Sequence, residues 1–520
     1  MKPKVGPLMV MAGLVTCTLA AWYNCFNGVF VLDDQSGIVA NPAIRQIWPL
    51  GGIFGWPPPV KRPLTELSLA VNYFLGGLST WGYHAVNLAL HLVGGLLLFG
   101  LVRRTLLLAS PRKGFSPEAI AGASALLWLV HPLQTESVTY VIQRAEVLAG
   151  MFHLLVLYSA LRAYALGNRN WWRGLAVLSC LLGVGAKESM FVAPLAVLLF
   201  DRGFLYPSFR LAFRERWPLY SGLVFSWVVL GALLVAGPRY EGALGNATHT
   251  VLEYARTQPA VILHYLRLCV WPSPLILDYE WRVAGWTIPE LLPGFLVVGG
   301  LLVFLLAKYR VYPRACSVGL WGYLVLAPSS SVFPLSDLAF EHRMYLPLAA
   351  VVILAVTGVS WSAGKLMVKP AGERLGLVLL AIVAVLLMAA TARRNSVYGN
   401  AIGMYEDLVS RRPNSVRGHH NLSTSLAAEG RYGDALPHIR RTVEIFPVYK
   451  EGYFNLGYIL YRLGRKEEAM RAYRKALAIS PTYQAPAVNL AIMLRARGRF
   501  AEADAIILRL KGDSPGLIKE

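Results

Sequence analysis

Residues 375–392 read LGLVLLAIVAVLLMAATA, a run of eighteen residues without a charged side chain. As a helix this run is about 27 Å long, close to the roughly 30 Å thickness of the hydrocarbon core of a bilayer. Similar apolar runs recur upstream as far as residue 5, and 56% of the 520 residues are hydrophobic while only 15% are charged. Ordinary soluble domains do not have this composition. The sequence therefore predicts a polytopic membrane protein.

Eleven membrane-spanning helices are expected, several of them shorter than a full span, which is typical of helices packed inside a bundle. Their expected bounds are 5–30, 84–102, 117–131, 144–165, 172–186, 189–200, 218–236, 288–306, 316–328, 345–361 and 375–392. The first is expected to stay uncleaved, because Trp22 and Tyr23 lie where an interfacial anchor would and no small-residue cleavage site follows. Residues 258–277 are the uncertain stretch, since a crossing there would reverse every later span.

The net charge of +21 is explained by topology rather than by nucleic acid. Lys and Arg are spread over short loops without a basic stripe, so we expect no nucleic-acid partner. They are most frequent at the N-terminus and in the loops after every second span. By the positive-inside rule the N-terminus is cytoplasmic, and an odd number of spans places the C-terminal part of the chain on the extracytoplasmic side.

The C-terminal part repeats itself every 34 residues. The matching columns are Pro413, Pro447, Pro481 and Pro515; Asn421, Asn455 and Asn489; Gly430, Gly464 and Gly498; and Ala435, Ala469 and Ala503. This period predicts three tetratricopeptide repeats, each with two antiparallel helices: Gly ends the first helix, Ala lies at the helix crossing and Pro follows the second helix. Such solenoids usually bind peptides or proteins on their concave face. We expect the three asparagines to bind an acceptor; the alternative is a lid that only packs on the membrane domain.

Two adjacent acids, Asp33 and Asp34, follow the first span in the segment LDDQSGIVANPAI. Neighbouring carboxylates repel each other, so we expect one of them to have a raised pKa and to be able to act as a general base. The alternative is a solvated cap of a loop helix. The pair also permits a divalent cation without requiring one, and we assign no metal ligand.

Further polar clusters are expected on the same outer face. Arg62 precedes a helix on which His84, Asn87 and His91 share one side, and His91 is expected to be a structural hydrogen-bonding group. Glu136, Arg144 and Glu146 interrupt an otherwise apolar stretch, where ionisable groups are costly unless paired or functional. A Glu136–Arg144 ion pair that only fixes a loop is the alternative to a functional role.

A last cluster consists of Lys187 with Glu188, and of Glu341, His342 and Arg343. Cations that face the acidic pair would suit a phosphate, because arginine can bind two of its oxygens at once. A base, fixed positive charge for a departing phosphate, and polar walls for a sugar together favour glycosyl transfer. The five cysteines lie in or beside apolar runs without CxxC or Cys/His spacing, so we interpret them as buried small hydrophobic residues.

Over nearly its whole length the chain resembles the transmembrane and tetratricopeptide-repeat protein O-mannosyltransferases and their prokaryotic relatives, in the GT-C class. Seven segments carry the resemblance in order: LDDQSGIVANPAI (32–44), KRPLTELSLAVNYFLGGLSTWGYHAVNLALH (61–91), HPLQTESVTYVIQRAEVLAG (131–150), AKESMFVAPLAVLLFD (186–201), HYLRLCVWPSPLILDYEW (264–281), EHRMYLP (341–347) and TARRNSVY (391–398).

The resemblance implies an all-α fold, with a GT-C-like catalytic bundle at 1–392, a linker helix at 393–412, three repeats at 413–515 and a tail at 516–520. It implies inverting transfer of a sugar from a polyprenyl-phosphate donor to Ser or Thr of a protein. Asp33 or Asp34 would deprotonate the acceptor. The residues expected to bind the donor phosphate or sugar are Arg62, Glu136, Arg144, Glu146, Lys187, His342 and Arg343.

The short repeat array suggests a prokaryotic enzyme in a bacterial inner membrane that acts on exported proteins. Three alternatives stay open: a GT-C enzyme that glycosylates a lipid or glycan, a non-enzymatic scaffold that docks partners through its repeats, and a transporter. A transporter would show sequence symmetry between its halves, and we see none.

Overall fold

The computed structural model describes residues 6–49, 51–54, 62–108, 115–165, 169–236, 249–366 and 371–513. The chain divides into two compact units, Met1–Gly399 and Asn400–Glu520. The secondary structure assigned in the described ranges is helical, with no strand. The α-helices of the first unit are α1 (Pro7–Ala21), α2 (Gly51–Phe54), α3 (Pro63–Gly76), α4 (Thr80–Leu108), α5 (Pro117–Leu129), α6 (Thr135–Val138), α7 (Arg144–Ala165), α8 (Arg169–Ala186), α9 (Ala193–Phe200), α10 (Phe209–Ala236), α11 (Val251–Val270), α12 (Ile288–Gly294), α13 (Gly300–Lys308), α14 (Pro313–Leu326), α15 (Pro347–Leu366) and α16 (Ala371–Val397).

Six helical stretches in the described part of the chain are long and apolar enough to cross a membrane. They are Thr80–Leu108, Val141–Ala165, Phe209–Val235, Ile288–Lys308, Pro347–Lys365 and Ala371–Val397. Two more apolar helices, α1 and α5, are shorter. The first unit is therefore a multi-pass membrane domain, whereas the expected count of eleven spans is not confirmed.

The first predicted span, 5–30, is too long. Helix α1 ends at Ala21, and a turn and a short 3-10 helix, Cys25–Asn27, follow it. The Trp22 indole is buried and donates a 3.0 Å hydrogen bond to the Leu129 carbonyl, and the Asn24 amide donates to the Ala392 carbonyl at 2.8 Å. These contacts fix the chain across the ends of α5 and α16 instead of continuing the helix.

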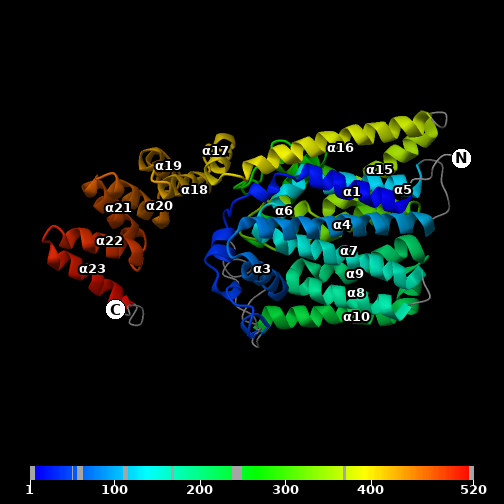
Figure 1. Ribbon diagram of the computed structural model, residues 1–520, viewed down its shortest axis with the longest axis horizontal. Helices are drawn as coiled ribbons and strands as arrows, with labels where there is room; N and C mark the ends of the chain where they lie inside the picture. Colours follow the sequence, from blue (N-terminus) through cyan, green and yellow to red (C-terminus); the bar gives the residue numbers. More distant parts are fainter. Residues whose placement is uncertain are drawn as a thin grey trace. The chain divides into compact units, whose positions relative to one another are not determined.

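The long helices of the first unit run side by side, as Figure 1 shows for α4, α7, α8 and α10. Two glycines allow close approach between neighbours. A Cβ added to Gly95 of α4 would lie 2.5 Å from Leu129, and one added to Gly150 of α7 would lie 2.4 Å from the Tyr345 ring. Small residues at such contacts are typical of helix packing in membranes.

The two ends of this bundle differ. In Figure 1, α1 and α16 begin at one end, and α3 and α6 lie at the other, where α16 ends. Helix α11 contacts this second end along its length: Tyr254 donates to the Ser329 carbonyl at 2.6 Å, and the Tyr265 hydroxyl accepts from the Phe340 amide at 2.8 Å. We therefore interpret the uncertain stretch 258–277 as lying along that end, with its last seven residues outside the helix.

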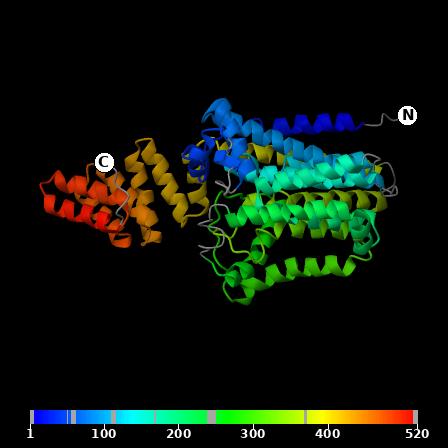
Figure 2. The same ribbon diagram turned by 90° about the horizontal axis from the view of Figure 1, so that it is seen from below.

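The second unit contains α17 (Ala401–Arg411), α18 (Val416–Ala428), α19 (Tyr432–Ile445), α20 (Lys450–Arg462), α21 (Lys466–Ile479), α22 (Gln484–Arg495) and α23 (Phe500–Asp513). Figure 2 shows the three pairs from α18 to α23 stacked in chain order. The predicted linker helix 393–412 is wrong: α16 ends at Val397, and Asn400 caps a new helix by accepting from the Ile402 amide.

The repeat pattern has the predicted structural roles. Glycines at 430, 464 and 498 follow the first helix of each pair with φ of 79°, 77° and 72°, a left-handed conformation that favours glycine. The three matching alanines are fully buried. Helices α17, α19 and α21 end just before Pro413, Pro447 and Pro481, while Pro515 lies outside the described residues.

Candidate active site

The acidic pair is divided by the fold. Asp34 is fully buried, and its two carboxylate oxygens accept from the backbone amides of Val31, at 3.0 Å, and Ile142, at 2.7 Å. Burial raises the pKa of Asp34 to about 7, whereas the charge of Asp33 is a minor cause of the shift. Burial rather than repulsion within the pair thus explains the raised pKa, and the Asp33 side chain is the exposed one.

The backbone places Asp33 in a tight turn. The preceding Leu32 has φ of 45°, which is uncommon for a residue with a side chain. The Asp33 amide donates to the Tyr140 hydroxyl at 2.9 Å. Buried Tyr140 is within electrostatic reach of Asp33, Asp34 and Glu136. Tyr140 therefore links the loop after α1 to the segment that carries Glu136. The sequence analysis did not predict this role of Tyr140.

Two ion pairs occupy the same end of the bundle. Arg62 donates to both carboxylate oxygens of Glu188, at 3.1 Å and 2.7 Å, and Lys187 pairs with Glu146. Arg62 precedes α3, Glu146 lies in the first turn of α7, and Lys187 follows α8. Both cations are only partly exposed, with relative side-chain accessibilities of 26% and 16%. The structure thus brings together four polar residues from three separate segments.

A buried Glu136–His342 contact adjoins these pairs. Glu136 accepts from the His342 backbone amide at 3.0 Å and contacts the His342 Nδ1 at 2.9 Å. Burial raises the pKa of Glu136 to about 8. Burial, and next the charge of Lys187, lower the pKa of His342 to about 3, with Glu146 and Arg62 also in electrostatic reach. The alternative Glu136–Arg144 ion pair is wrong, because Glu136 bonds His342 instead.

The guanidinium groups of Arg144 and Arg343 are bonded to the protein. Arg144 is buried and donates to Asn87, Asn72 and the carbonyls of Ser68 and Tyr83. Arg343 donates to the Tyr254 hydroxyl and to the carbonyls of Ser329, Leu338 and Asp337. Their predicted phosphate role has no support in these contacts, since each guanidinium group already makes four hydrogen bonds to the protein. Backbone carbonyls, which no sequence pattern shows, take up half or more of these bonds.

His91 is a structural hydrogen-bonding group, as predicted. Its Nδ1 contacts the Tyr345 hydroxyl and its Nε2 the Leu129 carbonyl, both at 3.0 Å. His84 contacts the Gly28 carbonyl at 3.0 Å, and Asn87 donates to the Val138 carbonyl. His84, Asn87 and His91 therefore join neighbouring segments of the bundle by hydrogen bonds, and we assign them no contact with substrate.

Two further charged residues join the cluster. Glu341 is fully buried and accepts from the Ile276 amide and from the Tyr279 hydroxyl, both at 2.7 Å. Arg394, near the end of α16, is within electrostatic reach of Glu136 and Glu341 and contacts Tyr398. Arg394 was not predicted, although an arginine pair that ends the most apolar run of the chain could have indicated it.

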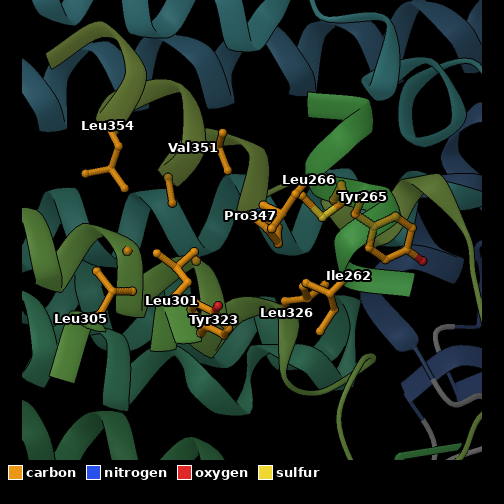
Figure 3. Close-up of a pocket in the computed structure, with 14 residues that line it drawn as sticks. Ile262, Tyr265, Leu266, Leu301, Leu305, Tyr323, Leu326, Pro347, Val351 and Leu354 are labelled. Carbon is orange, nitrogen blue, oxygen red and sulfur yellow. The ribbon is translucent and has the colours of Figure 1, made fainter. Parts of the chain in front are cut away.

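An apolar cavity of about 100 Å³ begins beside these charges. It is lined by α11, α13, α14 and α15, and Figure 3 shows Tyr265 near one end and Leu305 and Leu354 near the other. Met344, two residues after His342, also lines it. The Tyr265 hydroxyl accepts from the Phe340 amide, and Arg343 is within its electrostatic reach. The cavity thus adjoins the polar end of the bundle.

In the repeat unit the three matched asparagines are half-buried on the first helix of each pair. Asn455 contacts His420 at 3.4 Å and Thr424 at 3.5 Å, and Asn489 donates to the Tyr473 hydroxyl at 3.3 Å. Their role in binding an acceptor stays a prediction.

The Asp pair is a poor cation site because both Asp34 oxygens are bonded to amides, and no group of three potential ligands is found in the part that is described.

Comparison with known proteins agrees with the two-part organisation. Tetratricopeptide repeat families match residues 420–483 and 484–509. A protein O-mannosyl-transferase of Caenorhabditis elegans is 25% identical over 451 residues, covering 81% of this chain and 60% of its own length. The human protein O-mannosyl-transferase TMTC1 is 26% identical over 507 residues, covering 85% of this chain and 55% of its own length.

The chain is similar to protein O-mannosyl-transferases over most of its length. It spans little more than half the length of these two relatives. Among solved structures, the apo form of ArnT from Cupriavidus metallidurans matches this chain with a TM-score of 0.39 and 17% identity, over 91% of this chain and 79% of ArnT. That similarity is too low to assign a ligand or a residue role.

Proposed function

We propose that this protein moves a sugar from a polyprenyl-phosphate donor to Ser or Thr hydroxyls of an exported protein. The observation that supports the proposal is that an exposed carboxylate, Asp33, and the partly exposed cations Arg62 and Lys187 lie at the same end of the membrane bundle. Tyr140, Glu136 and His342 connect the two groups. A general base and fixed positive charge are the two groups that this reaction needs most.

Asp33 takes the proton of the acceptor hydroxyl in this scheme. The hydroxyl oxygen forms a bond to the anomeric carbon while the bond from that carbon to the phosphate oxygen breaks. Attack from the face opposite the leaving group inverts the anomeric carbon, and polyprenyl phosphate leaves with the electron pair. Asp34 holds the loop through its two amide bonds and touches no reacting atom.

Arg62 and Lys187 bind the donor phosphate in this scheme. Each is paired with a glutamate at the partly exposed end of the bundle, and a phosphate would compete for the same donors. Glu146 and His342 orient the cations and the sugar, and buried Glu136 holds His342 in place. Arg144 and Arg343 act indirectly, by fixing the segments that carry these groups.

The apolar cavity beside Tyr265 accepts part of the polyprenyl tail. Its volume of about 100 Å³ and its lining of aliphatic side chains suit hydrocarbon rather than water. The acceptor protein binds through the repeats, where the asparagine amides can both donate to and accept from a peptide backbone.

We place the end of the bundle that carries the site on the extracytoplasmic side of a bacterial inner membrane, with the N-terminus in the cytoplasm. Arg104 lies near the end of α4 and Arg374 near the start of α16. In Figure 1, α4 ends and α16 begins at the opposite end of the bundle, where α1 begins. The positive-inside rule then sets the orientation.

The test uses the purified full chain, labelled polyprenyl-phosphate hexose, and acceptor peptides rich in Ser and Thr. The proposal expects label in peptide, and unlabelled peptide with label in lipid alone would favour transfer to a lipid. No label in any product would support a non-enzymatic scaffold. An Arg144→Lys variant is a useful control, because it should lose stability rather than donor affinity.

A further inference from the structure

The loop 271–287, between α11 and α12, carries an aromatic cluster that none of the roles above explains. The His264 ring of α11 lies 5.1 Å from the Tyr279 ring and 5.1 Å from the Trp281 ring, and the Tyr279 and Trp281 centroids are 6.1 Å apart. Tyr279 is buried and Trp281 is half-buried, so the cluster runs from the interior towards the surface.

Glu341 fixes this cluster to the polar end of the bundle. One carboxylate oxygen accepts from both the Ile276 amide and the Tyr279 hydroxyl at 2.7 Å. The other, Oε2, is buried and has no hydrogen-bond partner among the residues that the structure describes. Buried carboxylate oxygens are normally bonded, so an orphan here indicates a missing partner.

The backbone between Tyr279 and Trp281 is strained. Glu280 has φ of 37°, and its amide donates to the Asp278 carboxylate at 3.0 Å. A residue with a side chain adopts this conformation only where the surroundings impose it, and such positions concentrate at functional sites. The strain belongs to the turn that presents Tyr279 and Trp281 beside His264.

We propose that Trp281, Tyr279 and His264, with the free oxygen of Glu341, form the subsite for the pyranose of the donor. The inference rests on the proposed function and identifies the part of the donor site that binds the sugar. A pyranose has an apolar face of C–H groups that packs on an aromatic ring, and hydroxyls at its rim that need acceptors. The electrostatic contact between Glu341 and Glu136 places this subsite next to His342, and thus next to the proposed phosphate ligands.

The experiment compares two ligands on the purified full chain: polyprenyl phosphate, and the same lipid carrying a hexose on its phosphate. Trp281→Ala is expected to weaken binding of the hexose-bearing lipid about tenfold and to leave binding of polyprenyl phosphate unchanged. Trp281→Phe keeps an aromatic face and should retain most of the affinity. Glu341→Gln should weaken only the hexose-bearing lipid, and thermal unfolding confirms that the variant is folded.

Trp271→Ala is the matched control, because Trp271 is an exposed tryptophan at the start of the same loop. An equal loss for both ligands in Trp281→Ala, or no loss for either, would overturn the sugar subsite and leave the proposed function standing. If the unaltered protein binds neither ligand, the proposed function fails and this inference fails with it.

Discussion

At the scale of single residues, Asp33 and Asp34 have the same chemistry and different surroundings. The sequence indicates the pair but not which member is the base, because the two amides that occupy Asp34 come from Val31 and from Ile142, far along the chain. Only the folded structure leaves Asp33 as the exposed carboxylate.

Asp33→Asn is expected to lower sugar transfer about 10²- to 10⁴-fold, the usual contribution of a general base, with little change in melting temperature. Asp34→Asn should instead lower stability by about 1–3 kcal/mol, because an amide nitrogen would face a backbone N–H. Transfer assays and thermal unfolding of both variants check this. Undiminished transfer by Asp33→Asn would remove Asp33 from the mechanism.

The sequence indicates most of the charged residues at the site, but the one ion pair that it suggests as an alternative is wrong. Glu136 bonds His342 rather than Arg144, and Arg144 and Arg343 bond largely to backbone carbonyls. Whether an arginine points at substrate or at protein depends on distant backbone positions, which one sequence does not show. The repeats were predicted in detail because the 34-residue period places each Gly, Ala and Pro in a purely local role.

At the scale of helices, α7 and the segment just before α15 approach each other through Gly150 and Tyr345. Tyr345 contacts His91 through its hydroxyl, and its carbonyl accepts from Trp128 and Gln134, so it connects four segments beneath the site. Apolar runs predicted the helices themselves; this contact depends on which faces meet, and the sequence contains no signal for that.

Gly150→Ala is expected to destabilise the membrane domain by about 1–3 kcal/mol, because the added methyl group would lie 2.4 Å from the Tyr345 ring. Gly13→Ala in α1 is the matched control, since nothing lies within 4 Å of a Cβ at that position. Thermal unfolding in detergent compares the two variants, and equal melting temperatures would show that the helices separate easily.

At the scale of the whole molecule, the site end of the first unit contains three buried carboxyl groups that release their protons at a higher pH than they do in the unfolded chain. Burial raises the pKa of Asp34 to about 7, of Glu136 to about 8 and of Glu341 to about 7. Buried histidines act in the opposite direction below about pH 6.5, because burial lowers the pKa of His342 to about 3 and the unfolded chain then binds the extra proton. Between about pH 7 and pH 9 histidines are largely neutral in both states, and the folded state keeps carboxyl protons that the unfolded chain has released.

Stability should consequently fall as pH rises from about 7 to 9, by at most about 1.4 kcal/mol per pH unit for each proton, and level off above about pH 9. Melting temperatures at pH 7 and pH 9 test this. Glu341→Gln should reduce the pH dependence, whereas Glu215→Gln, which changes an exposed carboxylate, should leave it unaltered. A melting temperature that rises over this range would contradict the raised pKa values.

The proposed site requires that the loop after α1 and the segment before α15 lie on the same side of the membrane. Single cysteines in place of Ser36, Ser336 and Arg310, all exposed, report on this in a background without the native cysteines. With a membrane-impermeant maleimide, labelling of Ser36→Cys and Ser336→Cys in intact cells is predicted, and labelling of Arg310→Cys only after permeabilisation. If Ser36→Cys and Ser336→Cys were labelled from opposite sides, the acidic and cationic groups could not form one site.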